Sequence, residues 1–358
     1  MTEVAFSIRS ITNESFLNVH EELKKEKVNN NAFFLDLHDL SLNGIDPYDP
    51  DLSDEVKEKI IKECENNFWY FIREVLRVPV PGGKYTRFTL HKGNLAAFHM
   101  LLNNISIYLE LPRQAYSSIS MGAFSLWEMI FKDNVKTMLG GIEKSNSMNR
   151  LYHIHDMSML LPLYIREKGK FTLSDNASYT NHTTNSVIRG LGNYTTEDKI
   201  RDQIRAMNCN RIMVEDFAFS KFNDVMIENS ENIRKVLIST IGETDSDEEK
   251  IAKSVIMNAI EFNSRFYDAF PDSLKYLIGR NSTNNIVYIK YDFTELKELD
   301  MNYFKWQCAS LNYDIDKINR EILLIRQYTP AEQAVMKLRE LHVSDRTLNE
   351  FLLNIIKE

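Results

Sequence analysis

The apolar positions near the N-terminal end of the chain repeat with a helical period. Between residues 53 and 76 they recur every three to four positions, which predicts an amphipathic helix with Ser53 as its N-cap. The pattern stops at 78–83, where the sequence VPVPGG predicts a loop because proline and glycine interrupt regular structure. A second helical pattern follows over residues 91–103.

Short apolar runs farther along the chain predict strands. The segment 105–111, ISIYLEL, alternates apolar and mixed positions, and a polar loop and a helical pattern that ends near 131 follow it directly. Further strands are predicted at 135–139, 211–214, 236–240 and 286–291. Helical segments lie between these runs. This alternation predicts an α/β fold whose sheet is largely parallel.

Cap sequences predict where the later helices begin. Ser246 and Glu249 form a capping-box pattern, as do Thr329 and Glu332. Ser344 is placed to cap a last helix. The C-terminal end is therefore expected to be helical.

Composition narrows the class of protein. The 358 residues include 43 Lys and Arg against 51 Asp and Glu, a formal net charge of −8, and 43% are hydrophobic. The 12 glycines and 8 prolines are too few for a turn-dense β sandwich. The acidic balance excludes a basic coat over the whole surface, so any DNA contact would be a local patch.

Cysteine use and targeting signals point to the cell interior. Cys64, Cys209 and Cys308 are far apart, which argues against a disulfide framework and fits a reducing compartment. The first residues lack the pattern of a secretory signal, and no apolar run approaches the ~18 residues of a membrane span. We expect a soluble protein that is not secreted and makes no membrane contact.

Two segments carry candidate chemistry. The loop that follows 105–111 has the position of a phosphate loop, between a strand and a helix, but it lacks the glycines and the lysine of G-x-x-x-x-G-K-S/T. About a hundred residues later, an apolar strand ends in Glu215 and Asp216. Adjacent carboxylates at a strand end have the geometry of a Walker B motif, in which one binds Mg²⁺ and the next polarises water.

Together these segments resemble the ATPase domain of the large terminase subunit of tailed bacteriophages, of the large myovirus-like type. That family has a deviant Walker A motif, R-Q-x-G-K-S/T, and LPRQAYSS matches it at Arg113, Gln114 and Ser118. The family's Walker B strand runs into D-E-F-A-F, and here the sequence is VEDFAF. Weaker similarities in NNFWYFIREVLRVP, RFTLHKGNLA, NSVIRGL, LISTIGE and LNYDIDKINREILL extend the resemblance over about 45–327.

The chain departs from the family pattern at three points. Tyr116 stands at the Walker A glycine, where it adds bulk beside the phosphate, and Ser117 stands at the lysine, which removes a positive charge. The Walker B pair is inverted to Glu215 and Asp216, so each carboxylate differs by one methylene from the expected length. The family's C-terminal nuclease domain is also expected to be absent.

The resemblance implies a P-loop NTPase-like fold of the additional-strand type. It implies a mostly parallel sheet flanked by helices, with a helical N-terminal region and a helical C-terminal tail. The implied divisions are an N-terminal arm at 1–50, the ATPase domain at 51–328 and the tail at 329–358.

The resemblance also implies site roles and the cofactors ATP and Mg²⁺. The implied nucleotide-binding residues are Arg113, Gln114, Ala115, Tyr116, Ser117 and Ser118. Glu215 and Ser118 would bind Mg²⁺, and Asp216 would polarise water. Catalysis would be assisted by Arg113 as a compensating cation, by Arg205 as a phosphate sensor and by Thr240 as a coupling residue.

Two functions remain open from the sequence. The first is a DNA-packaging ATPase module that couples ATP hydrolysis to translocation of double-stranded DNA into the capsid. Its implied partners are the portal protein, the small terminase subunit and a separate nuclease chain, with a possible homo-oligomeric ring in the host cytoplasm. The alternative is a catalytically degenerate terminase paralogue that acts as a structural or regulatory binding protein.

Overall fold

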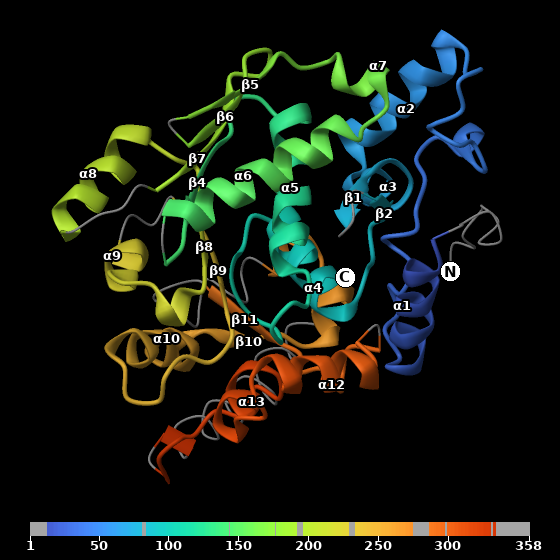
Figure 1. Cartoon of the computed structure of the whole chain (residues 1–358). Helices are drawn as coiled ribbons and strands as arrows, with labels where there is room; N and C mark the ends of the chain where they lie inside the picture. The colour runs from blue at the N-terminus through green and yellow to red at the C-terminus, as the bar shows by residue number, and fades with distance from the viewer. Residues whose placement is uncertain are drawn as a thin grey trace.

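The computed structural model describes most of the chain and gives it a layered α/β architecture (Figure 1). The described residues are 13–80, 84–142, 144–175, 177–191, 196–228, 233–274, 286–297, 299–330 and 332–333. Within these ranges, each helix is too short or too polar to cross a membrane.

The strands form a two-stranded hairpin and one large sheet. They are β1 (Arg77–Val80), β2 (Lys84–Arg87), β3 (Ser106–Glu110), β4 (Lys136–Gly140), β5 (Phe171–Ser174), β6 (Ser178–Asn181), β7 (Ser186–Gly190), β8 (Arg211–Glu215), β9 (Arg234–Ser239), β10 (Ile260–Glu261) and β11 (Ile286–Lys290). The large sheet has the order β10-β11-β3-β9-β8-β4-β7-β6-β5. All neighbours from β10 to β7 are parallel, and β6 pairs antiparallel with both β7 and β5.

Helices cover both faces of this sheet. They are α1 (Glu14–Lys25), α2 (Asp54–Asn66), α3 (Phe68–Tyr70), α4 (Lys92–Leu102), α5 (Ser117–Phe131), α6 (Lys144–Met159), α7 (Leu163–Arg166), α8 (Glu197–Met207), α9 (Asn223–Glu228), α10 (Asp247–Asn258), α12 (Met301–Ser310) and α13 (Ile315–Glu321). Short helical turns are η2 (Leu40–Leu42), η3 (Phe71–Val75), η4 (Phe217–Phe219) and η5 (Ser264–Asp268). In Figure 1, α12 and α13 run together along one side of the molecule.

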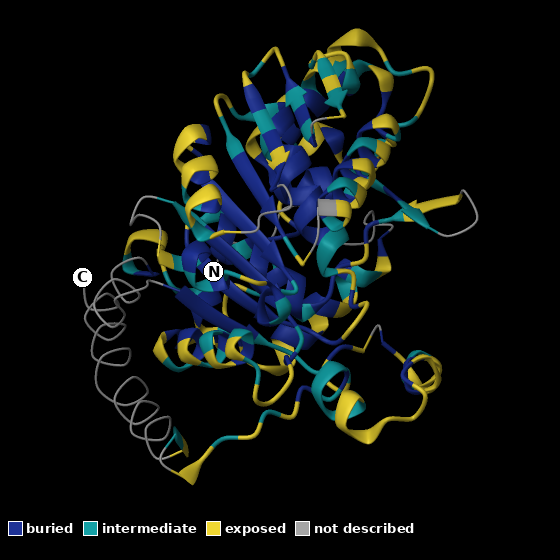
Figure 2. Cartoon of the chain, turned by 60° about the vertical axis from the view of Figure 1, so that its left-hand side comes forward, coloured by how far each residue is buried: buried dark blue, intermediate teal, exposed yellow. Residues whose placement is uncertain are grey.

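Side chains alternate between the two faces of each central strand. Ile107 and Leu109 of β3 belong to the core shared with α4, α5 and α6, whereas Tyr108 belongs to the core shared with α8, α9 and α10. The same alternation holds in β8, where Met213 joins the first core and Val214 the second. The sheet is buried on both sides (Figure 2), as expected for parallel strands covered by helices.

The strand order confirms the predicted fold class. Strand β9 lies between β3 and β8 and is parallel to both. The strand before the candidate phosphate loop is therefore separated by one additional strand from the strand that ends in the paired carboxylates. Because all three strands are parallel, their carboxyl ends meet at one edge of the sheet, where such folds bind ligands.

The predicted strands are confirmed, the loop predicted at 78–80 is wrong, and the predicted long helix is divided. The predicted strands at 105–111, 135–139, 211–214, 236–240 and 286–291 correspond to β3, β4, β8, β9 and β11. Residues 78–80, predicted as loop, belong to β1, which pairs with β2 in an isolated hairpin. Pro79 is tolerated there because an edge strand leaves its N–H side without a ladder partner. The long helix predicted over 53–76 is divided at Asn67 into α2, α3 and η3.

The two predicted capping boxes have different outcomes. Thr329 and Glu332 form the reciprocal pair, with the Thr329 N–H donating to Glu332 over 2.6 Å and the Glu332 N–H donating to Thr329 Oγ1 over 3.3 Å. Ser246 caps α10, but the Glu249 carboxylate accepts from the Gly242 N–H instead of returning to Ser246. Ser344 lies outside the described residues.

The described part of the N-terminal region packs into the main core. Phe16, Val19 and Leu23 of α1 are fully or almost fully buried, and they belong to the same apolar cluster as α4 and α5. The cysteines Cys64, Cys209 and Cys308 are free and buried.

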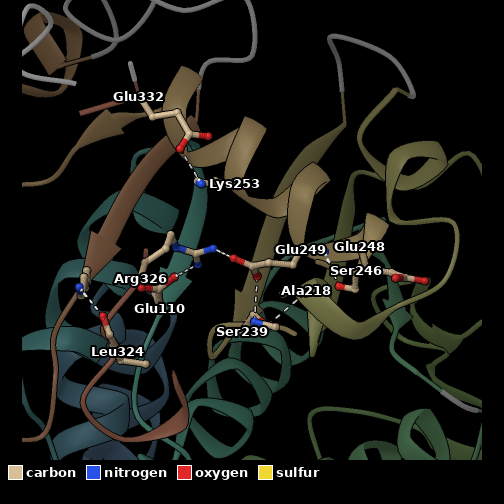
Figure 3. Close-up of polar contacts among 12 residues, drawn as sticks. Glu110, Ala218, Ser239, Ser246, Glu248, Glu249, Lys253, Leu324, Arg326 and Glu332 are labelled. Atoms are coloured by element: carbon tan, nitrogen blue, oxygen red, sulfur yellow. Dashed lines mark hydrogen bonds and ion pairs between the residues drawn. The ribbon is translucent and has the colours of Figure 1, made fainter. Parts of the chain in front are cut away.

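A buried ion cluster fastens the segment after α13 to the sheet (Figure 3). The Arg326 guanidinium pairs with Glu110 at the end of β3 and with Glu249 of α10. The side chains of all three residues are at most 5% exposed. Tyr288 also donates to Glu110, over 2.9 Å. Nearby, Lys253 pairs with Glu332 in a more accessible position, with the Nζ–Oε2 distance 2.7 Å.

We expect the Arg326→Met variant to lose about 3–5 kcal/mol of unfolding free energy. Removal of the guanidinium leaves two buried carboxylates without their cation, and breaking a buried ion pair carries this cost. The check is urea unfolding of the whole chain. Lys253→Met is the matched control, with a much smaller expected effect because its pair is partly hydrated. Equal losses of unfolding free energy in the two variants would contradict the conclusion that Arg326 fastens the segment after α13 to the sheet.

Candidate functional site

The candidate site begins at the loop that joins β3 to α5. Gln114 and Tyr116 both have left-handed backbone conformations, with φ of 60° and 58°. A non-glycine residue in this region is strained, by about 1–2 kcal/mol, so Tyr116 retains the backbone shape that favours glycine at this position. Its side chain is 57% exposed.

The N-terminus of α5 presents free N–H groups. Tyr116 is the N-cap residue but its side chain makes no capping hydrogen bond. The first α5 N–H that is bonded is that of Ser120, which donates to the Tyr116 carbonyl over 3.0 Å. Within the described chain, the N–H groups of residues 117–119 have no acceptor. Such groups, with the helix dipole, favour an anion.

Ser118 and Glu215 meet at the centre of the site. The Ser118 hydroxyl donates to Glu215 Oε2 over 2.6 Å, although the two residues are 97 positions apart in the sequence. Arg150 of α6 reaches the same oxygen, with its Nε 2.8 Å from Glu215 Oε2. Its Nη1 also donates to the Gly140 carbonyl over 2.6 Å. The site therefore combines the N-terminus of α5, the ends of β8 and β4, and α6.

Of the two carboxylates at the end of β8, Glu215 is buried and Asp216 is half-buried, and they differ in their partners. Burial raises the pKa of Glu215, while Arg150 and the Ser118 hydroxyl oppose the increase. Burial also raises the pKa of Asp216, and Arg150 and Arg113 oppose it. Asp216 has a φ of 52° and begins η4. The arrangement places Asp216 within the electrostatic reach of both guanidinium groups.

The predicted cation Arg113 and its neighbour Gln114 contact α12 and α13. The Arg113 Nη1 pairs with Glu321 Oε2 at 2.9 Å, and its N–H donates to the Glu321 carbonyl over 2.8 Å. Tyr303 donates to the Arg113 carbonyl, and Gln307 Nε2 donates to Gln114 Oε1 over 3.1 Å. The C-terminal helices thus cover this side of the loop.

A buried histidine supports the loop from beneath. His91 Nε2 lies 3.2 Å from the carbonyl oxygen of Ala115, and the His91 side chain also caps α4. Burial lowers the pKa of His91 to about 4. The ring is therefore neutral at physiological pH, and it fixes the carbonyl at the middle of the loop.

The predicted coupling and sensor residues lie farther from the loop. Thr240 follows β9 and is half-buried, but the hydrogen bond between β9 and η4 comes from its neighbour, because Ser239 Oγ accepts from the Ala218 N–H over 3.1 Å (Figure 3). Arg205 is exposed on α8 and makes no ion pair with any loop residue that the structure describes. The fold therefore brings residues 113–118, Glu215 and Asp216 together, but not Arg205.

A cavity in the described part of the chain is separate from the loop. It has a volume of about 780 Å³ and lies between α10 and the segment 316–332. Its lining includes Lys253, Arg320 and Arg326, but none of the predicted site residues.

The Mg²⁺ expected from the resemblance would meet a Glu215 oxygen that is already paired. Mg²⁺ prefers about six oxygen ligands at roughly 2.0–2.1 Å. Ser118 and Glu215 could supply two of them, but the Glu215 oxygen that faces Ser118 already pairs with the Arg150 cation. In the part of the chain that the structure describes, no cluster of three or more His, Cys, Asp or Glu residues could bind a metal ion. Metal binding by Ser118 and Glu215 stays a prediction.

Three residues of the site were missed from the sequence. Arg150, His91 and Glu321 are brought in from α6, the start of α4 and α13. Arg150 belongs to no motif, and His91 and Glu321 lie in RFTLHKGNLA and LNYDIDKINREILL, to which no site role was assigned. The Gly140–Gly141 pair at the end of β4 was an available signal for Arg150, since paired glycines after a strand mark a close approach. For His91, the signal was its position before a helix with Asn94 three residues later.

Comparison with known proteins gives structural similarity alone. Neither a protein-family model nor a curated protein matches the sequence. Solved structures with a similar fold include the large terminase of bacteriophage HK97, with 14% identity, a TM-score of 0.49, and coverage of 75% of this chain and 55% of that chain. They also include the large terminase ATPase domain of a Thermus phage, as a mutant, with 10% identity, a TM-score of 0.45, and coverage of 66% and 94%. A third is the ADP complex of the large terminase of a thermophilic bacteriophage, with 10% identity, a TM-score of 0.42, and coverage of 66% and 53%. This chain thus spans about half the length of the longer terminases and most of the isolated ATPase domain.

We expect the stability of the protein to fall between pH 6.5 and pH 4, partly because of His91. Its pKa is about 4 when folded and 6.5 ordinarily, so the unfolded chain binds the proton more readily. The neutral His91 ring contributes fully to the free energy of unfolding above pH 6.5. This contribution, about 3 kcal/mol, is lost as the pH falls to 4. Burial lowers the pKa of His99 to about 4 as well, so the His91→Asn variant should lose about half of this histidine-dependent slope.

The measurement is urea unfolding across this pH range. Asn retains the ability to cap α4, and His153→Asn, an exposed position on α6, is the matched control. If the pH dependence of the unfolding free energy is unchanged in the His91→Asn variant, the conclusion that the His91 ring is buried and neutral beneath the loop is wrong.

Proposed function

We propose that this chain binds the phosphates of ATP at the loop between β3 and α5 and is the ATPase module of a bacteriophage DNA-packaging terminase. The observation that supports this most is the contact between the Ser118 hydroxyl and Glu215. It joins the start of the helix after one parallel strand to the end of another, with β9 between the two strands. This is the relation between the phosphate loop and the Walker B strand in additional-strand ATPases.

Each site residue has a role in this proposal. The free N–H groups at the start of α5 receive the terminal phosphates, and Ser117 adds a hydroxyl donor. Asp216 orients the water that attacks the terminal phosphoryl group. Ser239 connects the end of β9 to the turn after Asp216, and Thr240, which follows it, would couple nucleotide state to movement.

Nucleotide binding requires the C-terminal helices to release the loop. Arg113 and Gln114 are held by Glu321 and Gln307 in the present arrangement. The Arg113 side chain is 46% exposed, and a solvent-exposed ion pair contributes about 0–1 kcal/mol. A polyphosphate can therefore displace Glu321, after which Arg113 faces the phosphates as the cation that compensates for the missing lysine.

The partners and location of the motor follow from the sequence resemblance. We propose that the chain acts on double-stranded DNA in the host cytoplasm. Its protein partners there would be the portal protein and the small terminase subunit. The active form would be a homo-oligomeric ring. Arg205 is then available on the surface of α8 for a neighbouring molecule.

A second function, a degenerate terminase paralogue that acts as a structural or regulatory binding protein, is favoured by two observations. Tyr116 and Ser117 replace the residues that contact phosphate most closely in the family. Glu321 also neutralises Arg113, the nearest exposed cation of the loop.

The two functions are distinguished by ATP titration calorimetry, with phosphate release followed in the same samples with and without double-stranded DNA. The proposal predicts saturable binding and phosphate release that DNA stimulates. Absence of binding at millimolar ATP would favour the binding protein. The Ser118→Ala variant tests the location, since it should weaken binding while an exposed serine variant such as Ser145→Ala should not.

We expect the double variant Tyr116→Gly with Ser117→Lys to release phosphate at least about tenfold faster than the natural chain. The lysine restores a positive charge at the transferring phosphoryl group, and such electrostatic groups contribute about 10²–10³ in rate. The glycine removes the strain and the bulk at the left-handed position.

The control for this prediction is Tyr116→Gly with Ser117→Met, which has the same backbone change and a side chain of similar length without charge. A similar rate in the two double variants would show that charge is not what the loop lacks. No rate increase in either would contradict an ATPase whose only defect lies in the loop.

A further inference from the structure

Arg150 occupies the centre of the candidate site, yet no sequence motif includes it. It extends from α6 to the ends of two strands, where its Nε is 2.8 Å from Glu215 Oε2 and its Nη1 donates to the Gly140 carbonyl over 2.6 Å. The residue is 8% exposed. A guanidinium this deeply buried is costly unless it is paired, so its position is determined by these contacts.

The backbone at the end of β4 is shaped to admit this side chain. A Cβ on Gly141 would lie 3.2 Å from Arg150 Nη1 and 3.3 Å from Nη2, which is tighter than an ordinary contact. Glycine therefore lets the guanidinium lie against the main chain. Among the described residues, Nη2 has no hydrogen-bond acceptor, so one donor of a buried cation remains available.

The Arg150 guanidinium is paired with an oxygen that a divalent cation held by Ser118 and Glu215 would use. A metal ion shared by Ser118 and Glu215 would need both of their oxygens at about 2.0–2.1 Å. In this structure, the Ser118 hydroxyl proton points to Glu215 Oε2, and Arg150 binds that same oxygen. Arginine does not lose its charge in proteins, so a second cation beside it would be repelled.

We propose that Arg150 is the resident cation of this site and that, with the free N–H groups at the start of α5, it binds the phosphoryl group of a nucleotide without a divalent metal. This inference rests on the proposed function, because it assumes that the loop binds nucleotide. Arg150 neutralises Glu215, so the carboxylate does not repel the phosphate. Its free Nη2 supplies a charged donor to the phosphate oxygens, in a planar geometry suited to them.

The test is calorimetric titration of the full chain with a non-hydrolysable ATP analogue, adenylyl imidodiphosphate, in excess EDTA and in excess Mg²⁺. For the natural chain we expect Kd values in the two conditions to agree within about threefold. For Arg150→Met we expect Kd in EDTA to increase by about 10-fold to 100-fold, the loss typical of one charged hydrogen bond. Mg²⁺ should then restore binding, because Glu215 is released.

Two further variants keep the test decisive. Arg166→Met, a helix-surface arginine on α7 that bonds only a main-chain carbonyl in the described chain, is the matched control and should bind as the natural chain does. Arg150→Met with Glu215→Gln removes the carboxylate that the single variant leaves unpaired. It should bind weakly in both EDTA and Mg²⁺, and its thermal unfolding reports whether the fold is intact.

The outcomes separate this inference from the proposed function. Binding of the natural chain only in Mg²⁺ would overturn the role of Arg150 and leave nucleotide binding at the loop in place. An equal loss of binding in Arg150→Met and Arg166→Met would also overturn it. Absence of binding in both EDTA and Mg²⁺ would overturn the proposed function itself.

Discussion

One carboxylate oxygen of Glu215 holds the candidate site together. Ser118 and Arg150 both contact it, over 2.6 Å and 2.8 Å, and they come from different helices on the same face of the sheet. The contact is possible because β3, β9, β8 and β4 are adjacent and parallel, so that their carboxyl ends meet at one edge. Burial of Glu215 makes the contact costly to break, since an unpaired buried charge loses its hydration without compensation. The start of α5, the position of α6 and the environment of Asp216 all depend on this oxygen.

The C-terminal segment makes ion pairs of different strength with the sheet and with the loop. Arg326 is buried between two carboxylates, one at the end of β3 and one on α10. The contact between Arg113 and Glu321 is partly hydrated. A ligand can compete with a hydrated ion pair far more easily than with a buried one. Arg326 therefore keeps the segment after α13 attached to the sheet, while α12 and α13 can move away from the loop.

The sequence predicted the sheet and half of the site. Alternating or continuous apolar runs are local signals, so the buried strands and the loop before α5 were predicted correctly, and the pair of Ser118 and Glu215 followed from motif positions. β5 and β6 were missed because they are four-residue strands at the antiparallel end of the sheet, with partly buried positions and a weak apolar pattern. Pro79 gave a false loop signal because an isolated hairpin tolerates it.

The remaining part of the site depends on tertiary structure. Arg150 lies in a helix whose polar and apolar positions carry no motif, and only the fold places its guanidinium against Glu215. Glu321 and Gln307 reach the loop from about 200 positions away in the sequence. A charged residue on a helix is usually solvated, so no local pattern could distinguish these side chains from surface charges.

The most direct test of nucleotide binding at the β3–α5 loop is hydrogen–deuterium exchange of the full chain with and without ATP. Binding there predicts slower exchange over residues 113–120, where the N–H groups at the start of α5 are free. It also predicts slower exchange over 215–219, which begin at the last residue of β8. It predicts little direct protection at the cavity between α10 and 316–332, which contains no predicted site residue. Protection confined to that cavity, or no protection at saturating ATP, would contradict nucleotide binding at the β3–α5 loop.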